Sequence, residues 1–212
     1  MRILLTGATG YIGKRLIPIL LESDHSLVCC VRDTQRVPEE VSSHERIELI
    51  EVDFLKPETL HRIPKDIDVA YYLIHSMSSS MKFEKLEEEC AINFKKCIEA
   101  TNAQQVIYLS GIVNDQQLSK HLQSRKNVEN TLASKKYALT TFRAGIIVGS
   151  GSASFEIIRD LTEKLPIMIA PKWINTKSQP IGIRNVLEYL TKAIGNEKVY
   201  NQSYDIFGPN TL

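Results

Sequence analysis

The chain has 212 residues, of which 43% are hydrophobic and 24% charged, and its formal net charge at pH 7 is +1. This length and apolar content are enough for one domain with a large core. Acids and bases are interspersed, so we expect no nucleic-acid surface, and no apolar run reaches the roughly 18 residues of a membrane span. The composition therefore indicates a globular protein with neither a nucleic-acid partner nor a membrane span.

The first dozen residues predict a strand, a glycine turn and a helix. Ile3–Thr6 is an apolar run typical of a buried strand, and Tyr11–Glu22 has a helical pattern. Between them, Gly7 can adopt a positive φ, Gly10 allows a phosphate to approach the backbone, and Gly13 lets the helix pack closely on the strand. The free N–H groups at the start of the helix favour an anion. This arrangement predicts a site for a pyrophosphate.

The glycine turn has two other interpretations. A tight strand–helix connection without a ligand has the same glycine spacing. A phosphate loop of the ATP-binding type requires Gly-Lys-Ser or Gly-Lys-Thr at its end, whereas this turn ends in Tyr11-Ile12-Gly13. The sequence therefore argues against ATP chemistry of that type.

Apolar strands and helical patterns continue to alternate along the chain. Further buried strands are predicted at Leu27–Val31, Ile47–Val52, Val69–Ile74, Val106–Leu109 and Leu139–Phe142. Helical patterns between them cover Pro57–Arg62, Lys82–Thr101 and Ser119–Ser134. Six strands with crossover helices predict an α/β fold with a doubly wound parallel sheet in residues 1–150.

The pattern changes after residue 150. A Gly/Ser loop at Gly149–Ser152 leads into a predicted helix at Phe155–Lys164, a strand at Ile167–Ala170, a helix at Arg184–Ile194 and a strand at Tyr204–Phe207. We assign residues 151–212 to a small substrate-side lobe of the same domain. Another helix would be natural after residue 209, so we expect the lobe to be truncated.

Cysteine and histidine usage indicates neither a disulfide framework nor a metal site. Cys29, Cys30, Cys90 and Cys97 form no CxxC pair. The five histidines are scattered without metal-ligand spacing. A reducing cytoplasm is the simplest location, and a strand that begins at residue 2 leaves no room for a signal peptide.

Several segments carry a family resemblance. They are Thr6–Gly13, the pair Asp53-Phe54, Asp68–His75, Asn93, Tyr108–Gly111 and Phe142–Gly145. Their order, over nearly the whole chain, resembles the short-chain dehydrogenase/reductase superfamily in its extended or atypical branch, whose fold is of the Rossmann type. The stretch from Arg143 to Phe155, with Gln179–Ile181, is similar to bacterial NmrA-like NAD(P)-binding proteins. Some of those have an additional C-terminal domain, which we expect in the full-length protein.

The resemblance implies a dinucleotide site along the carboxyl edge of the sheet. The implied residues are Gly7, Ala8, Thr9, Gly10, Tyr11, Ile12 and Gly13 at the pyrophosphate, Asp53 and Phe54 at the adenine, and Leu73, Ile74 and His75 beside the nicotinamide ribose.

The second predicted strand ends in residues that bear on the choice of cofactor. An acidic residue at this place accepts the ribose 2′-OH of NAD, whereas arginine favours the 2′-phosphate of NADP. Arg32 comes first here, and Arg36 adds a second charge, so NADP(H) is favoured over NAD(H). If Asp33 faces the ribose instead, NAD would bind. A solvated charge cluster is the third interpretation.

The family's catalytic pattern is altered in this chain. The Tyr-xxx-Lys pair, four residues apart on one helix face, is replaced by His121 and Arg125. The family's serine position falls on Gly111, with Ser110 one residue before it. His121 could act as a general acid, with Arg125 lowering its pKa or holding a ribose or carboxylate. The alternative is a solvated helix face, and the tyrosines Tyr71, Tyr72 and Tyr108 are expected in the core.

The Gly/Ser loop before the Phe155–Lys164 helix has two interpretations. It could bind an anionic group of a substrate at the helix N-terminus. It could equally be a flexible connection with Ser154 as the N-cap and Glu156 in the first turn. Met168 and Trp173 could line a substrate cleft or pack within the lobe.

Two functions fit these features. The first is an NADP(H)-dependent oxidoreductase acting on an unidentified small organic substrate, with the hydride chemistry supplied by the cofactor. The second is a regulatory or assembly protein that senses NAD(P) without turnover. The altered catalytic positions favour the second function, and the glycine turn fits both.

Overall fold

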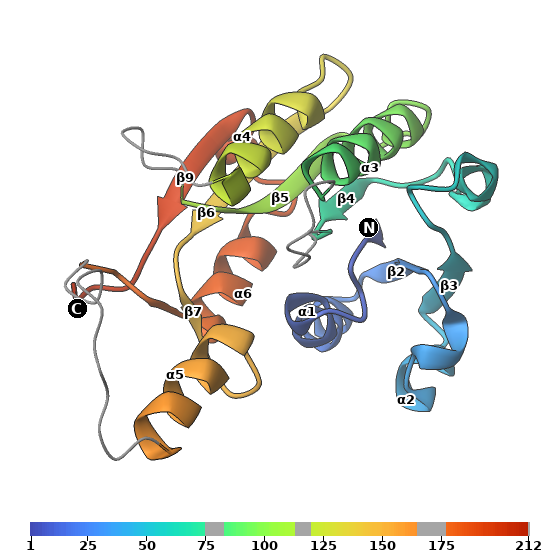
Figure 1. The fold of residues 1–212 in the computed structure, drawn as a ribbon. Helices are drawn as coiled ribbons and strands as arrows, with labels where there is room; N and C mark the ends of the chain where they lie inside the picture. The colour runs from blue at the N-terminus through green and yellow to red at the C-terminus, as the bar shows by residue number, and fades with distance from the viewer. Residues whose placement is uncertain (75–82, 113–119, 165–176, 212) are drawn as a thin grey trace.

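The computed structural model describes residues 1–74, 83–112, 120–164 and 177–211. These residues form a seven-stranded sheet in the order β3-β2-β1-β4-β5-β6-β9, with every neighbouring pair parallel (Figure 1). The strands are β1 (Arg2–Leu5), β2 (Ser26–Val31), β3 (Ile47–Glu51), β4 (Val69–Tyr72), β5 (Gln105–Gly111), β6 (Ala138–Ala144) and β9 (Gln202–Ile206). The strand order reverses between β1 and β4, which confirms the doubly wound α/β sheet of the Rossmann type. In such sheets a ligand binds at the carboxyl ends of the strands at this switch point.

Helices cover both faces of the sheet (Figure 1). The helices α1 (Tyr11–Glu22) and α6 (Ile183–Lys192) pack on one face, and α3 (Phe83–Ile98) and α4 (Lys120–Leu132) pack on the other. Successive strand residues point to opposite faces. Ile3 and Leu5 therefore join the core under α1, whereas Leu4 joins the core under α3.

The predicted elements lie close to the observed ones, and a few short ones were missed. The helix at Tyr11–Glu22 and the 3₁₀ turn at Pro57–Arg62 have the predicted bounds. Patterns of periodicity did not reveal the 3₁₀ turn at Thr34–Arg36, α2 (Glu39–Ser42), or the parallel pair β7 (Ile147–Val148) and β8 (Ile181–Gly182), because these elements are shorter than two repeats. The predicted strand at residues 167–170, with Met168, and Trp173 lie outside the described residues.

The segment after residue 150 contributes to the central sheet as well as to a peripheral part. Its strand β9 pairs with β6, and its helix α6 covers the same face as α1. Helix α5 (Ala153–Lys164) follows β7. The division at residue 150 and the truncated lobe stay predictions. The expected N-cap, Ser154, is corrected to Ser152, whose hydroxyl accepts a hydrogen bond from the Phe155 N–H at 3.2 Å.

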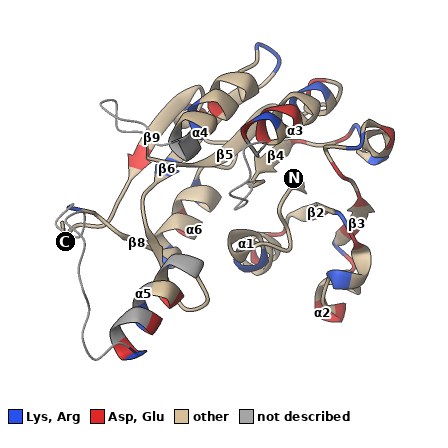
Figure 2. Cartoon of the chain, in the orientation of Figure 1, with Lys and Arg blue, Asp and Glu red and all other residues tan. Residues whose placement is uncertain are grey.

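Neither the charges nor the cysteines of the described residues indicate a particular class of protein. Positively and negatively charged residues are interspersed along the described chain (Figure 2). All four cysteines are free thiols. Among the described residues, no helix is long and apolar enough to cross a membrane, and no three His, Cys, Asp or Glu residues gather as metal ligands would.

Candidate functional site: a dinucleotide crevice

The turn between β1 and α1 is a cradle that only glycine can form at two of its positions. Gly7 has a φ of +67°, and a Cβ added there would lie 2.8 Å from the Leu73 carbonyl oxygen. A Cβ on Gly13 would lie 2.3 Å from the Gly7 carbonyl oxygen. The Gly10 N–H donates to that same oxygen at 2.9 Å, which closes the turn. The backbone is therefore compact enough for a phosphate to approach it.

The first turn of α1 presents backbone donors to this cradle. Gly10 is the N-cap and provides no side chain, and the first turn contains no acidic residue. The Lys14 N–H donates to the Gly10 carbonyl at 3.0 Å as the first bond of the helix. The N–H groups of Tyr11, Ile12 and Gly13 precede that bond, so they and the helix dipole favour an anion. The residues present fit a pyrophosphate.

A threonine fixes the strand ends at the switch point. The Thr6 hydroxyl donates to the Tyr71 carbonyl at 2.9 Å and accepts from the Leu73 N–H at 3.0 Å. Thr6 thereby ties β1 to the segment leaving β4, and Leu73 and Ile74 follow directly at the crevice. His75, the third residue expected there, lies outside the described residues.

The loop after β3 is held in place from two sides. The Asp53 N–H donates to the Thr59 hydroxyl at 3.0 Å, and an Asp53 carboxylate oxygen accepts from the Leu55 N–H at 3.0 Å. On the other side, the Asn93 amide on α3 donates to the Phe54 carbonyl at 2.7 Å. The Phe54 ring is buried with its centroid 5.6 Å from that of Phe94, so its side chain supports the loop from within the core.

Arg32 and Asp53 both act electrostatically on a buried thiol. Burial and the carboxylates of Asp53, Glu89 and Glu87 raise the pKa of Cys90 on α3 to about 12, against the charge of Arg32, which lowers it. Residues that follow β2 and β3 therefore both influence the same side chain of α3. This brings together two residues that the sequence predicted for the adenosine end of a dinucleotide.

Asp33 is occupied by local contacts. One carboxylate oxygen accepts from the Gln35 N–H at 3.0 Å and so caps the 3₁₀ turn at Thr34–Arg36. The other lies 3.3 Å from the Arg36 guanidinium. Arg32 and Arg36 are both exposed, so their charges remain accessible to a ligand.

A small hollow opens beside the glycine turn on the α1 face of the sheet. Its volume is about 140 Å³, and the residues that line it include Thr9, Lys14, Val31, Val37 and Glu40. Lys14 adds a positive charge next to the phosphate cradle.

Two of the candidate catalytic residues, Ser110 and Arg125, act on the phenol of Tyr108, which the sequence predicts only as a core residue. Tyr108 on β5 is buried, as predicted. Burial raises the pKa of its hydroxyl to about 12, while the Ser110 hydroxyl and the Arg125 charge lower it. Ser110 is 3% exposed, and its oxygen makes no hydrogen bond of good geometry within the described part of the chain. His121 lies in the first turn of α4, and its side chain is outside the described ones.

Charged residues behind this cluster form a fixed network. The Arg143 guanidinium on β6 donates to both carboxylate oxygens of Glu129 on α4, at 3.0 and 2.8 Å. The Ser203 hydroxyl on β9 donates to the same carboxylate at 2.6 Å. The hydrogen bonds with Glu129 raise the pKa of Arg143 and hold α4 against the sheet. No local pattern predicts this pair, because its partners lie on different elements, 14 positions apart.

Comparison with protein families agrees with the geometry. The model of a family described as NAD(P)H-binding matches residues 7–151, which include the glycine turn, both strand ends and the Tyr108 cluster. The chain belongs to this NAD(P)H-binding family.

Solved structures similar to this NAD(P)H-binding protein share its fold. UDP-glucuronic acid 4-epimerase from Bacillus cereus, in complex with NAD, has a TM-score of 0.80 at 18% identity, covering 100% of this chain and 78% of that one. Yeast methylglyoxal/isovaleraldehyde reductase, complexed with NADPH, has a TM-score of 0.81 at 15% identity, covering 98% and 78%. A short-chain dehydrogenase/reductase from Veillonella parvula in complex with NADP has 0.71 at 18%, covering 99% and 95%. These structures confirm the short-chain dehydrogenase/reductase fold.

One curated relative matches part of the chain. Trichosetin synthetase PKS-NRPS1 of Gibberella fujikuroi is 31% identical over 93 residues, which cover 40% of this chain. The chain spans only 2% of the length of that protein.

In the second glycine loop of the NAD(P)H-binding protein, a backbone N–H already binds a carboxylate of the same chain. The Gly151 N–H donates to the Glu156 carboxylate at 2.8 Å. A substrate anion at this amide would have to displace Glu156, so the structure favours a connecting and capping role for the loop.

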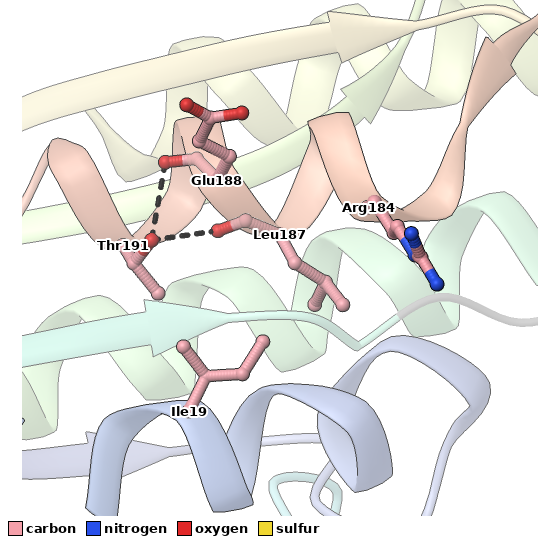
Figure 3. A pocket seen from close by; sticks show the side chains of 5 residues that line it. All are labelled: Ile19, Arg184, Leu187, Glu188 and Thr191. Carbon is pink, nitrogen blue, oxygen red and sulfur yellow. Dashed lines mark hydrogen bonds between the residues drawn. The ribbon is translucent and has the colours of Figure 1, made fainter. Parts of the chain in front are cut away.

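A larger hollow lies between α1 and α6, and side chains from the facing sides of these two helices line it (Figure 3). Its volume is about 260 Å³, and Ile19, Arg184, Leu187, Glu188 and Thr191 line it. The Thr191 hydroxyl already donates to the carbonyls of Leu187 and Glu188 at 2.9 and 3.1 Å. This hydroxyl is therefore already engaged within α6 and is not free to orient a substrate.

Proposed function

We propose that the chain is an NADP(H)-dependent oxidoreductase of the short-chain dehydrogenase/reductase type, acting on a small organic substrate. The observation that carries the cofactor preference is the arrangement at the end of β2. Asp33 is engaged with the Gln35 N–H and with Arg36, whereas Arg32 is exposed, and the charges of Arg32 and Asp53 both act on the Cys90 thiol. An arginine in this position favours a 2′-phosphate.

Each part of the crevice then has a role. The N–H groups of the α1 first turn bind the pyrophosphate, and Arg32 and Arg36 bind the 2′-phosphate. When bound, the cofactor supplies or accepts a hydride at its nicotinamide. His121 stands at the family's proton-donor position, where an imidazole serves as a general acid, and Arg125 stands four residues later to orient a ribose or a substrate oxygen.

The cofactor preference is tested by replacing one arginine. We expect Arg32→Ala to weaken NADPH binding about 10- to 100-fold, because a charge-assisted contact with the phosphate is lost. NADH binding is expected to change less than about threefold, since NADH has no 2′-phosphate. Isothermal titration with both nucleotides measures the two losses. Arg46→Ala is the control, because Arg46 pairs with Asp24 at the amino ends of β2 and β3, whereas Arg32 follows the carboxyl end of β2. Equal losses for both nucleotides would refute the preference.

A non-catalytic NAD(P) sensor is the second candidate, and one observation favours it. The family's Tyr, Lys and Ser positions hold His121, Arg125 and Gly111, and the Ser110 hydroxyl is buried beside Tyr108. A protein with this site could bind the nucleotide without turnover.

Turnover distinguishes the two candidates. We expect NADPH oxidation, followed by absorbance, with at least one member of a panel of quinones, flavins and aldehydes. His121→Ala is expected to lower that rate about 100-fold, as general acid catalysis contributes 10²–10⁴-fold. Glu84→Ala, at an exposed position of α3, is the control. Tight NADPH binding with no turnover on any substrate would support the sensor instead.

A further inference from the structure

Arg15 connects the phosphate cradle to a distant loop. Its guanidinium lies 3.9 Å above the Tyr11 ring and donates to the Tyr11 carbonyl at 3.2 Å within α1. The same guanidinium donates to the Ser150 carbonyl at 2.7 Å, across 135 positions of sequence. One side chain thereby holds the first turn of α1, which presents the pyrophosphate donors, and the loop that precedes α5.

The loop packs directly on Tyr11. A Cβ added to Gly149 would lie 2.6 Å from the Tyr11 hydroxyl and 2.6 Å from the Ile183 side chain at the start of α6. Gly151, at a φ of +78°, brings the chain past the Arg15 guanidinium, with 3.5 Å between that group and an added Cβ. At Gly149 the absence of a side chain allows this close approach, and at Gly151 the positive φ favours glycine.

The loop is in turn hydrogen-bonded into α5. The Gly151 N–H donates to Glu156 in the first turn of α5 at 2.8 Å. The Ser152 hydroxyl donates to the Ile147 carbonyl at 3.0 Å and accepts from the Phe155 N–H at 3.2 Å. An unbroken set of contacts therefore leads from the first turn of α1, through Arg15 and the loop, to the N-terminus of α5.

We propose that Arg15 is a positioning residue that couples dinucleotide binding at the α1 first turn to the ordering of α5. The inference rests on the proposed nucleotide binding at the cradle. A nucleotide that fixes the Tyr11 backbone also fixes the acceptor and the ring on which Arg15 rests. Arg15 then holds the loop, and the loop caps α5. Such coupling is reciprocal, so the factor by which the nucleotide stabilises α5 equals the factor by which an ordered α5 strengthens nucleotide binding.

Amide hydrogen exchange on the full chain, with and without saturating NADPH, tests the coupling. The quantity compared is the ratio of exchange rates in residues 153–164 without and with NADPH. In the wild type we expect a ratio on the order of five or more, a coupling within the usual range. In Arg15→Met, which keeps the stem on the Tyr11 ring but removes both hydrogen bonds and the charge, we expect a ratio near one. NADPH affinity should fall by the same factor.

Two further variants make the test decisive. Arg15→Lys retains the charge without the planar fork and is expected to give an intermediate ratio, which also covers the case in which Arg15→Met does not fold. Arg46→Met is expected to leave the ratio unchanged. A purely structural role of Arg15 would speed exchange equally with and without NADPH and would keep the wild-type ratio, which would overturn the proposal. A wild type that binds NADPH without protecting α5 would also overturn it. Absence of nucleotide binding by calorimetry would instead identify the proposed function as the point of failure.

Discussion

Replacement of Gly13 by alanine is expected to destabilise the protein and to remove nucleotide binding together. The new Cβ would lie 2.3 Å from the Gly7 carbonyl oxygen and 2.9 Å from the Ala8 Cα, and both are backbone atoms that a rotamer change cannot move. The start of α1 must therefore shift away from β1. Overpacking of this kind costs about 3 kcal/mol, which corresponds to a fall in Tm of about 6–12 °C for a domain of this size.

The same shift displaces the N–H groups that the pyrophosphate needs. We expect the affinity for NADPH to fall on the order of 100-fold, measured by titration below the lowered Tm. Gly145→Ala is the matched control, since the nearest atom to its Cβ is a side-chain carbon at 3.5 Å and its φ is not positive. That control should change Tm by less than about 3 °C. A Gly13→Ala protein with wild-type Tm and affinity would show that the turn is looser than the structure describes.

The second large effect is expected at Gln105, which is fully buried and holds three elements together. Its amide nitrogen donates to the Thr140 hydroxyl at 3.0 Å and to the Ala193 carbonyl at 2.9 Å, and its oxygen accepts from the Gly195 N–H at 3.0 Å. Gln105→Leu keeps the volume but leaves the Ala193 carbonyl and the Gly195 N–H at the end of α6, and the Thr140 hydroxyl on β6, without this partner. The cost of such unpaired buried groups is about 1–3 kcal/mol each, and we expect about 3 kcal/mol in total because water can reach some of them.

Chemical denaturation measures this loss as a lower midpoint at an unchanged slope. The adjacent Gln104 is exposed, and its side-chain amide donates to the nearby Asn102 carbonyl, at 2.9 Å. Gln104→Leu is therefore the matched control and should change the free energy of unfolding by less than about 0.5 kcal/mol. Similar losses in the two variants would contradict the anchoring role of Gln105.

The central sheet could be predicted from the sequence because its signals are local. Apolar runs that alternate with helical patterns predict parallel strands, and the glycine spacing at Gly7, Gly10 and Gly13 predicts the turn into α1. Asp33 shows the limit of such reasoning. A carboxylate at a strand end fits a ribose, a cap or an ion pair equally well, and only the contacts with Gln35 and Arg36 show how it is used.

The nicotinamide end was less predictable because its groups come from different elements. The sequence predicts Tyr108 in the core, and the residue is buried. Its hydroxyl is nevertheless influenced by Ser110 on its own strand and by Arg125 on α4. Alternation along β5 puts residues 108 and 110 on one face and could have indicated the first of these neighbours. The approach of α4 depends on packing, including the pair Arg143–Glu129, which no local pattern reveals.

The link between the cradle and α5 bears on both candidate functions. In an oxidoreductase, a nucleotide that orders α5 would prepare the substrate side before the substrate arrives. In a sensor, the same coupling would report the nucleotide to a partner. The coupling experiment therefore does not depend on which candidate is correct, whereas the turnover assay does.

The proposed function depends most on the crevice binding NADP(H) in preference to NAD(H). Isothermal titration of the wild-type chain with NADPH and with NADH measures this preference. We expect one NADPH per chain, with a Kd at least about tenfold below that for NADH, because Arg32 and Arg36 would hold the 2′-phosphate. Equal or tighter binding of NADH, or binding of neither nucleotide, would contradict it.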